Sequence, residues 1–302
     1  MDTVTGVDMA IAVAQNGGIA ILPRFDIPQV QAQKVKKVKS KNLPVAASIG
    51  IKEGEWSRLK ILVDAGVDHI NLDVAHGHLE TVVDLVKKIR KEYPRLSLSA
   101  GVVATYQGAF NLFKAGADVV TVGIGPGSIC TTRIQTGSGV PQFTAITEAS
   151  RAARKFGKII WANGGTKNSG DVVKCLAAGA SAVICGNIFA GTDEAPPKII
   201  TIKGKKYKPY NGSTSLIEKQ RQLGKNKLDK SSSYISHVEG VSGFVPYKGP
   251  LSDYLKSFLA GVRSGYSYSG AFNTPDLWEK AKFCQVSSQA LRESNPHDII
   301  QL

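Results

Sequence analysis

The sequence has few cysteines, few acidic residues and no long apolar run, and each scarcity excludes a class of protein. Its 302 residues include four cysteines, at positions 130, 175, 185 and 284, and their spacing does not suggest disulfides or a zinc site. No apolar stretch approaches the roughly 18 residues that span a bilayer, and the start at Met1 resembles no signal peptide. We therefore expect a cytoplasmic protein without a membrane partner.

The scarcity of acidic residues leaves a formal net charge of +14, from 38 Lys+Arg against 24 Asp+Glu. Much of this excess is local, because nine basic residues between Lys203 and Lys230 accompany only Glu218 and Asp229. Aromatic residues make up 7% of the chain and form no interleaved stacking platform in this segment. Nucleic acid is therefore not the expected partner, whereas an anionic ligand or a flexible segment fits the charge.

With 42% apolar and 21% charged residues, the chain can bury a sizeable core. Short β-branched runs recur along its first two thirds, each followed by an amphipathic stretch of helical character, and their starts lie 21 to 40 residues apart. This alternation predicts parallel strands with helical crossovers. The predicted strands are Gly18–Leu22, Val45–Ile49, His69–Asp73, Leu98–Val103, Val119–Ile124, Ile159–Asn163 and Ala182–Gly186.

Seven strands are one short of a (β/α)8 TIM barrel, and an open doubly wound sheet is the alternative fold. The even spacing favours an α/β barrel whose missing first strand would precede Met1. The longest interval, from 119 to 159, and the irregular stretch from about 192 to 250 would then be loops at the carboxyl ends of the strands, where barrels hold their chemistry.

The long loop after the fifth predicted strand contains the clearest chemical signal. Three glycines, Gly123, Gly125 and Gly127, let backbone groups approach a ligand, and Cys130 follows them beside threonines and an arginine. A thiol in such a polar, cationic setting is a candidate nucleophile. A glycine-rich turn with an incidental cysteine is the alternative.

The segment Gly123-Ile-Gly-Pro-Gly-Ser-Ile-Cys-Thr-Thr-Arg133, followed by Gly139-Val-Pro-Gln142, resembles the active-site loop of the IMP dehydrogenase and GMP reductase family. Further matches, such as Met1-Asp-Thr-Val-Thr5 and Leu291-Arg-Glu-Ser-Asn-Pro-His-Asp298, extend the resemblance over nearly the whole chain. It implies a single barrel domain, 1–302, with an active-site loop at 123–142 and a mobile flap at about 204–250. The regulatory CBS domains of most IMP dehydrogenases are absent, because the chain simply continues through 25–43.

The resemblance implies that Cys130 attacks C2 of a purine while hydride passes between C2 and NAD or NADP. Thr132 and Glu239 would move protons, and Glu239 would also bind the purine edge. Asp73, Gly123 and Gly125 would contact the nicotinamide cofactor; a helix N-cap is the alternative role for Asp73. The remaining residues implied to bind the purine nucleotide are Ser128, Asn163, Gly164, Gly165, Gly186, Asn187, Tyr210 and Gly212.

The resemblance also implies a potassium ion held by the carbonyls of Gly125, Gly127 and Cys130. Glu293, Ser294 and Asn295 of a neighbouring subunit would complete its coordination, which implies a homotetramer. Hard oxygen ligands without dense charge suit a monovalent cation better than magnesium or zinc.

The chain departs from the family pattern at four places. Asn163 replaces an aspartate that takes both ribose hydroxyls, Gly101 replaces an asparagine, and Thr121 replaces a basic residue. The dehydrogenase flap carries an Arg-Tyr pair that activates water, and no such pair occurs between Leu216 and Glu239. We expect an IMP dehydrogenase, with GMP reductase as the alternative and a catalytically silent purine-nucleotide-binding protein as the second alternative.

Overall fold

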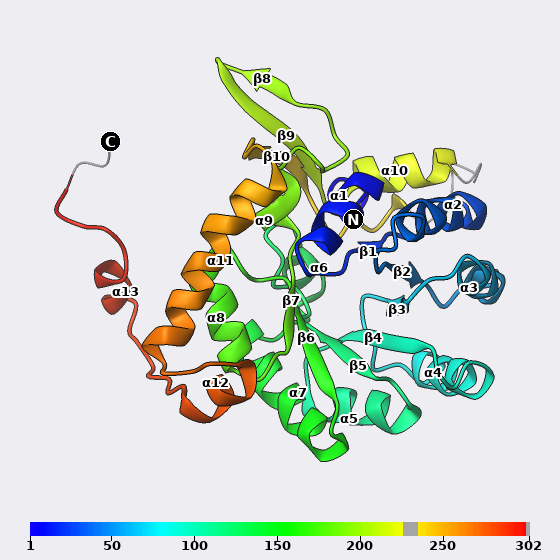
Figure 1. Ribbon diagram of the computed structural model, residues 1–302, viewed down its shortest axis with the longest axis horizontal. Coiled ribbons are helices and arrows are strands. Elements are labelled where there is room, and N and C mark those ends of the chain that lie inside the picture. Colours follow the sequence, from blue (N-terminus) through cyan, green and yellow to red (C-terminus); the bar gives the residue numbers. More distant parts are fainter. Residues whose placement is uncertain (226–234, 300–302) are drawn as a thin grey trace.

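The computed structural model describes residues 1–225 and 235–299, and it contains all seven predicted strands. They form one parallel sheet in the order β1-β2-β3-β4-β5-β6-β7, so consecutive strands are neighbours throughout (Figure 1). The predicted parallel α/β architecture is thereby confirmed. The strands are β1 (Ile21–Leu22), β2 (Ala46–Ile49), β3 (His69–Asp73), β4 (Ser97–Val103), β5 (Val119–Val122), β6 (Ile159–Asn163) and β7 (Ala182–Ile184).

Helices connect and flank the strands, and none in the described ranges is long and apolar enough to span a bilayer. The longer helices beside the sheet pack through apolar residues at helical spacing; in the helix Glu80–Glu92, for example, Val82, Val86 and Ile89 are all fully buried. The helices are α1 (Val7–Gln15), α2 (Pro28–Lys39), α3 (Glu55–Asp64), α4 (Glu80–Glu92), α5 (Tyr106–Ala115), α6 (Thr132–Thr136), α7 (Gln142–Phe156), α8 (Ser169–Ala177), α9 (Asn187–Ala190), α10 (Leu216–Lys225), α11 (Leu251–Tyr268), α12 (Thr274–Lys280) and α13 (Ala290–Glu293).

The sheet does not close on itself within the described residues, because β1 pairs only with β2 and β7 only with β6. The seam between these two edge strands is where an eighth strand would stand in a closed barrel. Apolar side chains line both sides of it: Val13 and Ile21 come from α1 and β1, and Val183 and Val262 from β7 and α11. The seven-stranded sheet is thus an incomplete barrel.

A second, antiparallel sheet was not anticipated from the sequence. It has the order β10-β9-β8 and comprises β8 (Ile200–Ile202), β9 (Lys205–Asn211) and β10 (Ser242–Pro246). The β8–β9 hairpin projects beyond the barrel (Figure 1). Not all of its positive charge faces solvent, because Lys208 is buried and its Nζ donates to three backbone carbonyls, those of Thr192, Asp193 and Ala195. Part of the predicted flap, residues 226–234, lies outside the described residues.

Two of the departures from the family pattern are neighbours in the structure. Gly101 of β4 pairs with Thr121 of β5. A Cβ atom at position 101 would overlap both the hydroxyl and the backbone carbonyl of Thr121. Gly101 and Thr121 therefore form one coupled change of packing rather than two independent ones.

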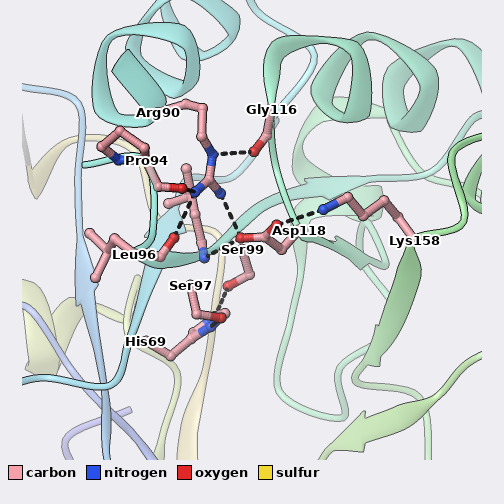
Figure 2. A network of polar contacts seen from close by, with 10 residues as sticks. His69, Arg90, Pro94, Leu96, Ser97, Ser99, Gly116, Asp118 and Lys158 are labelled. Carbon is pink, nitrogen blue, oxygen red and sulfur yellow. Dashed lines mark hydrogen bonds and ion pairs between the residues drawn. The ribbon is translucent and has the colours of Figure 1, made fainter. Parts of the chain in front are cut away.

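A polar network ties together the amino-terminal ends of β3, β4 and β5 (Figure 2). His69 contacts Ser97 Oγ through Nδ1 at 2.8 Å and Ser99 Oγ through Nε2 at 2.7 Å. Because the Ser99 hydroxyl donates to Asn71 Oδ1, Ser99 accepts the Nε2 proton of His69. Burial lowers the pKa of His69 to about 4, against the smaller opposite effect of Asp118. The imidazole is therefore neutral in the folded protein at pH 7.

This burial predicts a loss of stability in mild acid. A histidine in the unfolded chain binds a proton below pH 6.5, whereas folded His69 does so only near pH 4, so unfolding takes up a proton between these values. The free energy of unfolding should fall by about 2.5 kcal/mol from pH 7 to pH 4.5 on account of this residue. Urea unfolding of wild type and His69→Gln at pH 7 and at pH 4.5 measures this fall in the free energy of unfolding. An equal fall in both proteins would contradict the assignment.

Candidate active site

The loop that carries Cys130 starts at the carboxyl end of β5 and is clamped by the segment around Gly240. Cys130 and Gly240 form an antiparallel bridge, and Ser215 at the start of α10 bridges to the same glycine. Val241 N donates to Ile129 O at 3.0 Å. Thr131 N likewise donates to Glu239 O at 3.0 Å. Backbone pairing thus brings two segments more than 100 residues apart into fixed register.

This pairing aligns three of the predicted residues in one chain of hydrogen bonds. The Cys130 thiol donates to Thr132 Oγ1 at 3.2 Å, and the Thr132 hydroxyl donates to Glu239 Oε2 at 2.6 Å. All three side chains are partly buried. The arrangement can carry a proton between the sulfur region and the carboxylate, provided that a water or substrate atom completes the path.

Glu239 is held in its ionised form. The hydrogen bond from Thr132 lowers its pKa, and a hydrogen bond from His237 with the positive charge of Lys219 acts in the same direction against partial burial. His237 Nε2 lies 2.8 Å from Glu239 Oε1. His237 was missed by the sequence analysis, although its position two residues before Glu239 is the signal that could have found it, since residues i and i+2 of an extended segment share a face.

One cavity of about 880 Å³ opens at the carboxyl ends of the strands and continues into the apolar seam between β7 and β1. Cys130, Thr132 and Glu239 line it. So do all the residues predicted to contact the nucleotide and the nicotinamide, together with Gly127. These residues are Asp73, Gly123, Gly125, Ser128, Asn163, Gly164, Gly165, Gly186, Asn187, Tyr210 and Gly212. The family resemblance implied that these residues would converge, and the common face at which parallel strands end explains it for those that follow the barrel strands.

Ser128, Tyr210 and Gly186 lie against one another at one end of the cavity. Burial raises the pKa of the Tyr210 phenol, and a hydrogen bond with Ser128 partly offsets this rise. A Cβ at Gly186 would stand 2.9 Å from Tyr210 Oη. Gly164 and Gly165 both have positive φ, 80° and 84°, which only glycine adopts without strain and which turns the backbone after β6. Backbone groups that are free of side chains suit a phosphate.

Asp73 and Asn163 end β3 and β6 and line the cavity from two sides. Asp73 does not cap a helix, because α4 begins at Glu80 and its N-cap residue is Leu79. Arg24, a further cavity residue that the sequence analysis overlooked, places Nε 3.9 Å from Asp73 Oδ2. Its position just beyond the end of β1 is the signal that was missed.

Other predicted groups lie away from the cavity. Glu293, Ser294 and Asn295 belong to or follow α13, which Figure 1 shows well removed from α6, the helix that begins two residues after Cys130. Of the basic residues of α10, Lys219 donates to the backbone carbonyl of His237, and Arg221 lies 3.5 Å from Asp2. Neither lines the cavity, and none of the other basic flap residues whose side chains the structure describes lines it.

The other cysteines differ from Cys130 in their surroundings. Burial raises the pKa of Cys175 to about 11 and that of Cys185 to about 12. Both thiols therefore stay protonated at neutral pH and are poor nucleophiles. Cys284 is exposed and lies outside the cavity.

Comparisons with known proteins agree with this geometry. The family model described as "IMP dehydrogenase / GMP reductase domain" matches residues 1–297. Inosine-5'-monophosphate dehydrogenase of Aquifex aeolicus is 48% identical over 257 residues, which is 85% of this chain and 52% of that protein. The proteins of the same name from Nitrosopumilus maritimus and Streptococcus pyogenes are 44% and 46% identical, over 85% of this chain and 54% and 52% of theirs.

The chain spans about half the length of the curated relatives that it matches. The match nevertheless runs from the first residue past α13, and it includes the Cys130 loop, the segment at Glu239 and every strand of the incomplete barrel. On this evidence, the chain belongs to the IMP dehydrogenase / GMP reductase family.

Proposed function

We propose that the protein is an IMP dehydrogenase that converts IMP, NAD⁺ and water to XMP, NADH and a proton. The observation that carries this proposal is the hydrogen-bonded chain Cys130–Thr132–Glu239 at the edge of a nucleotide-sized cavity. The relatives that bear the name IMP dehydrogenase support the direction of the reaction.

In the first half-reaction, the Cys130 thiol gives up its proton to solvent, the resulting thiolate adds to C2 of IMP, and the hydrogen at C2 leaves as hydride. NAD, the cofactor that the family implies, would supply the hydride acceptor when bound, and the purine would remain on the Cys130 sulfur as a thioimidate. A soft thiolate suits addition to an electron-poor ring carbon. Asp73, Arg24, Gly123 and Gly125 line the part of the cavity that we assign to the nicotinamide.

In the second half-reaction, water adds to C2 and the Cys130 thiolate leaves. The attacking water must lose a proton, and Thr132 with ionised Glu239 is the route that the geometry offers. The thiolate that departs is ready for the next cycle. Hydrolysis would be the slower half, because no described basic flap residue reaches the cavity to activate water.

The backbone around Ser128, Gly164, Gly165, Gly186 and Asn187 would hold the 5'-phosphate. Tyr210 and Gly212 would close over it, since all seven residues line one cavity.

A potassium ion would be held by the carbonyls of Gly125, Gly127 and Cys130, as membership of the family implies. Among the described residues, no cluster of acidic, histidine or cysteine side chains offers a site for a divalent metal instead. Glu293, Ser294 and Asn295 of a second copy would complete the coordination, so the site would need an oligomer, and a homotetramer is the assembly that the family implies.

GMP reductase is the second candidate, favoured by the short Thr132–Glu239 hydrogen bond combined with the lack of a described water-activating pair. A reductase uses this relay to deliver protons to the departing ammonia. The two activities are distinguished by the change in absorbance at 340 nm, measured with purified protein in the presence of potassium. A rise with IMP and NAD supports the dehydrogenase, and a fall with GMP and NADPH supports the reductase. Activity with neither pair would favour the silent nucleotide binder.

Asn163 offers a test of nucleotide placement that does not depend on turnover. The Asn163 amide oxygen can accept from the ribose, whereas a carboxylate accepts two hydroxyl bonds with charge assistance. Asn163→Asp should therefore bind IMP about threefold to tenfold more tightly, as measured by calorimetry. Unchanged or weaker binding would show that residue 163 does not face the ribose. Asn187→Asp is a matched control at the phosphate end, where an added negative charge should weaken binding.

A further inference from the structure

A histidine that the proposed chemistry does not use lies at the outer end of the Cys130–Thr132–Glu239 chain. The side chain of Glu239 is 21% exposed, and that of His237 is 57% exposed. Because an ionised carboxylate only accepts hydrogen bonds, the 2.8 Å contact requires His237 Nε2–H to donate to Glu239 Oε1. Glu239 is thus bonded on both oxygens, by Thr132 on one and by His237 on the other.

The backbone of His237 is fixed independently of its imidazole. Lys219, a buried residue of α10, donates through Nζ to the His237 carbonyl. Two residues further on, the carbonyl of Glu239 accepts from Thr131 N, and Gly240 bridges to Cys130 and Ser215. The segment 237–240 is therefore anchored from α10 on one side and from the Cys130 loop on the other.

A carboxylate with one oxygen unbonded would be free to rotate about χ3, because the range of favourable χ3 angles is broad for glutamate. Rotation would move Oε2 out of the 2.6 Å contact with Thr132 and interrupt the path to Cys130. A donor on Oε1 opposes this rotation, because turning the carboxylate would break two hydrogen bonds instead of one.

We propose that His237 is a positioning residue that holds the carboxylate of Glu239 against Thr132, so that the proton path to the substrate stays connected. The inference rests on the proposed function, because it concerns the relay used there. It does not require His237 to carry the proton: an amide at position 237 that donates one N–H to Oε1 should serve as well.

The first readout is steady-state turnover with IMP and NAD, and with GMP and NADPH, for wild type, His237→Ala and His237→Gln. His237→Ala should lower kcat about tenfold without changing KM for the nucleotide, and His237→Gln should recover most of the loss. Equal losses in the two variants would overturn a positioning role, as would an unchanged kcat in His237→Ala or a rise in KM. His78→Ala is the matched control, because His78 contacts Asn111 rather than the relay.

The second readout needs no turnover, so failure of the proposed function can be told apart from failure of this inference. In wild type the Thr132 hydroxyl donates its hydrogen bond to Glu239. If Glu239 rotates away, this hydroxyl can donate a hydrogen bond to the Cys130 sulfur instead, which favours the reactive thiolate. Alkylation of Cys130 by iodoacetamide, followed on its own peptide by mass spectrometry, should therefore be about threefold faster in His237→Ala than in wild type. His237→Gln should return the rate to the wild-type value. An equal rate in all three proteins would overturn the inference even if IMP is oxidised normally.

Discussion

Replacing Cys130 with alanine is expected to lower turnover by at least about a thousandfold with either substrate pair, because no other group can form the covalent purine. Cys175 and Cys185 cannot take over, since burial holds their thiols protonated. Alanine leaves the backbone bridge to Gly240 intact, so the fold around the loop should persist. The measurement is the change in absorbance at 340 nm under saturating substrates.

Cys284→Ala is the matched control, because this thiol is exposed but lies outside the cavity. It should retain full activity. Because exposed Cys284 will also react with alkylating reagents, labelling alone does not identify the nucleophile; protection by bound IMP does. Substantial turnover in Cys130→Ala, or loss of activity in Cys284→Ala, would refute the assignment of Cys130.

The second large effect is expected from Glu239→Gln, which keeps an oxygen near Thr132 but removes the proton acceptor. Turnover should fall roughly a hundredfold, the lower end of what general acid–base catalysis contributes. The loss should be confined to hydrolysis, because addition of Cys130 and hydride transfer do not need this carboxylate. Rapid mixing of IMP and NAD should therefore still give a burst of NADH equal to the number of sites, followed by slower turnover than in wild type.

A burst that disappears together with turnover would contradict the claim that Glu239 acts in hydrolysis and not in hydride transfer. If the protein is a reductase, the same variant should abolish NADPH oxidation with GMP, since ammonia then leaves without its proton. Fast turnover of wild type on IMP without any burst would show that another group activates water. Lys227 and Lys230 of the flap, which lie outside the described residues, would be the first to test.

The barrel strands could be predicted because a parallel sheet covered by helices is built from short apolar runs with no alternation. All four residues of Val119–Val122 are buried, for example. The loop after this strand could also be identified, since Gly123 to Arg133 is a continuous motif. Glu239 could be linked to it only through the family resemblance, because 107 residues separate it from Thr132.

The small antiparallel sheet could not be predicted from the same kind of pattern. In β9, Lys205 and Lys206 are exposed while Lys208 is buried against backbone carbonyls, so charge alone suggested a solvated flap. The coupling of Gly101 to Thr121 was equally hidden, because it depends on strand register rather than on either residue. His237 was overlooked because it lies in an irregular stretch, where only its spacing of two residues from Glu239 pointed to a shared face.

The most direct test of the central claim is whether the purine becomes attached to Cys130. The protein is mixed with IMP and NAD in the presence of potassium, quenched in acid within the NADH burst, digested and analysed by mass spectrometry. We predict a purine-nucleotide adduct on the peptide that contains Cys130, which should be absent when NAD is omitted and absent in Cys130→Ala. NADH formation without an adduct on this peptide, or an adduct on Cys175, Cys185 or Cys284, would contradict the account.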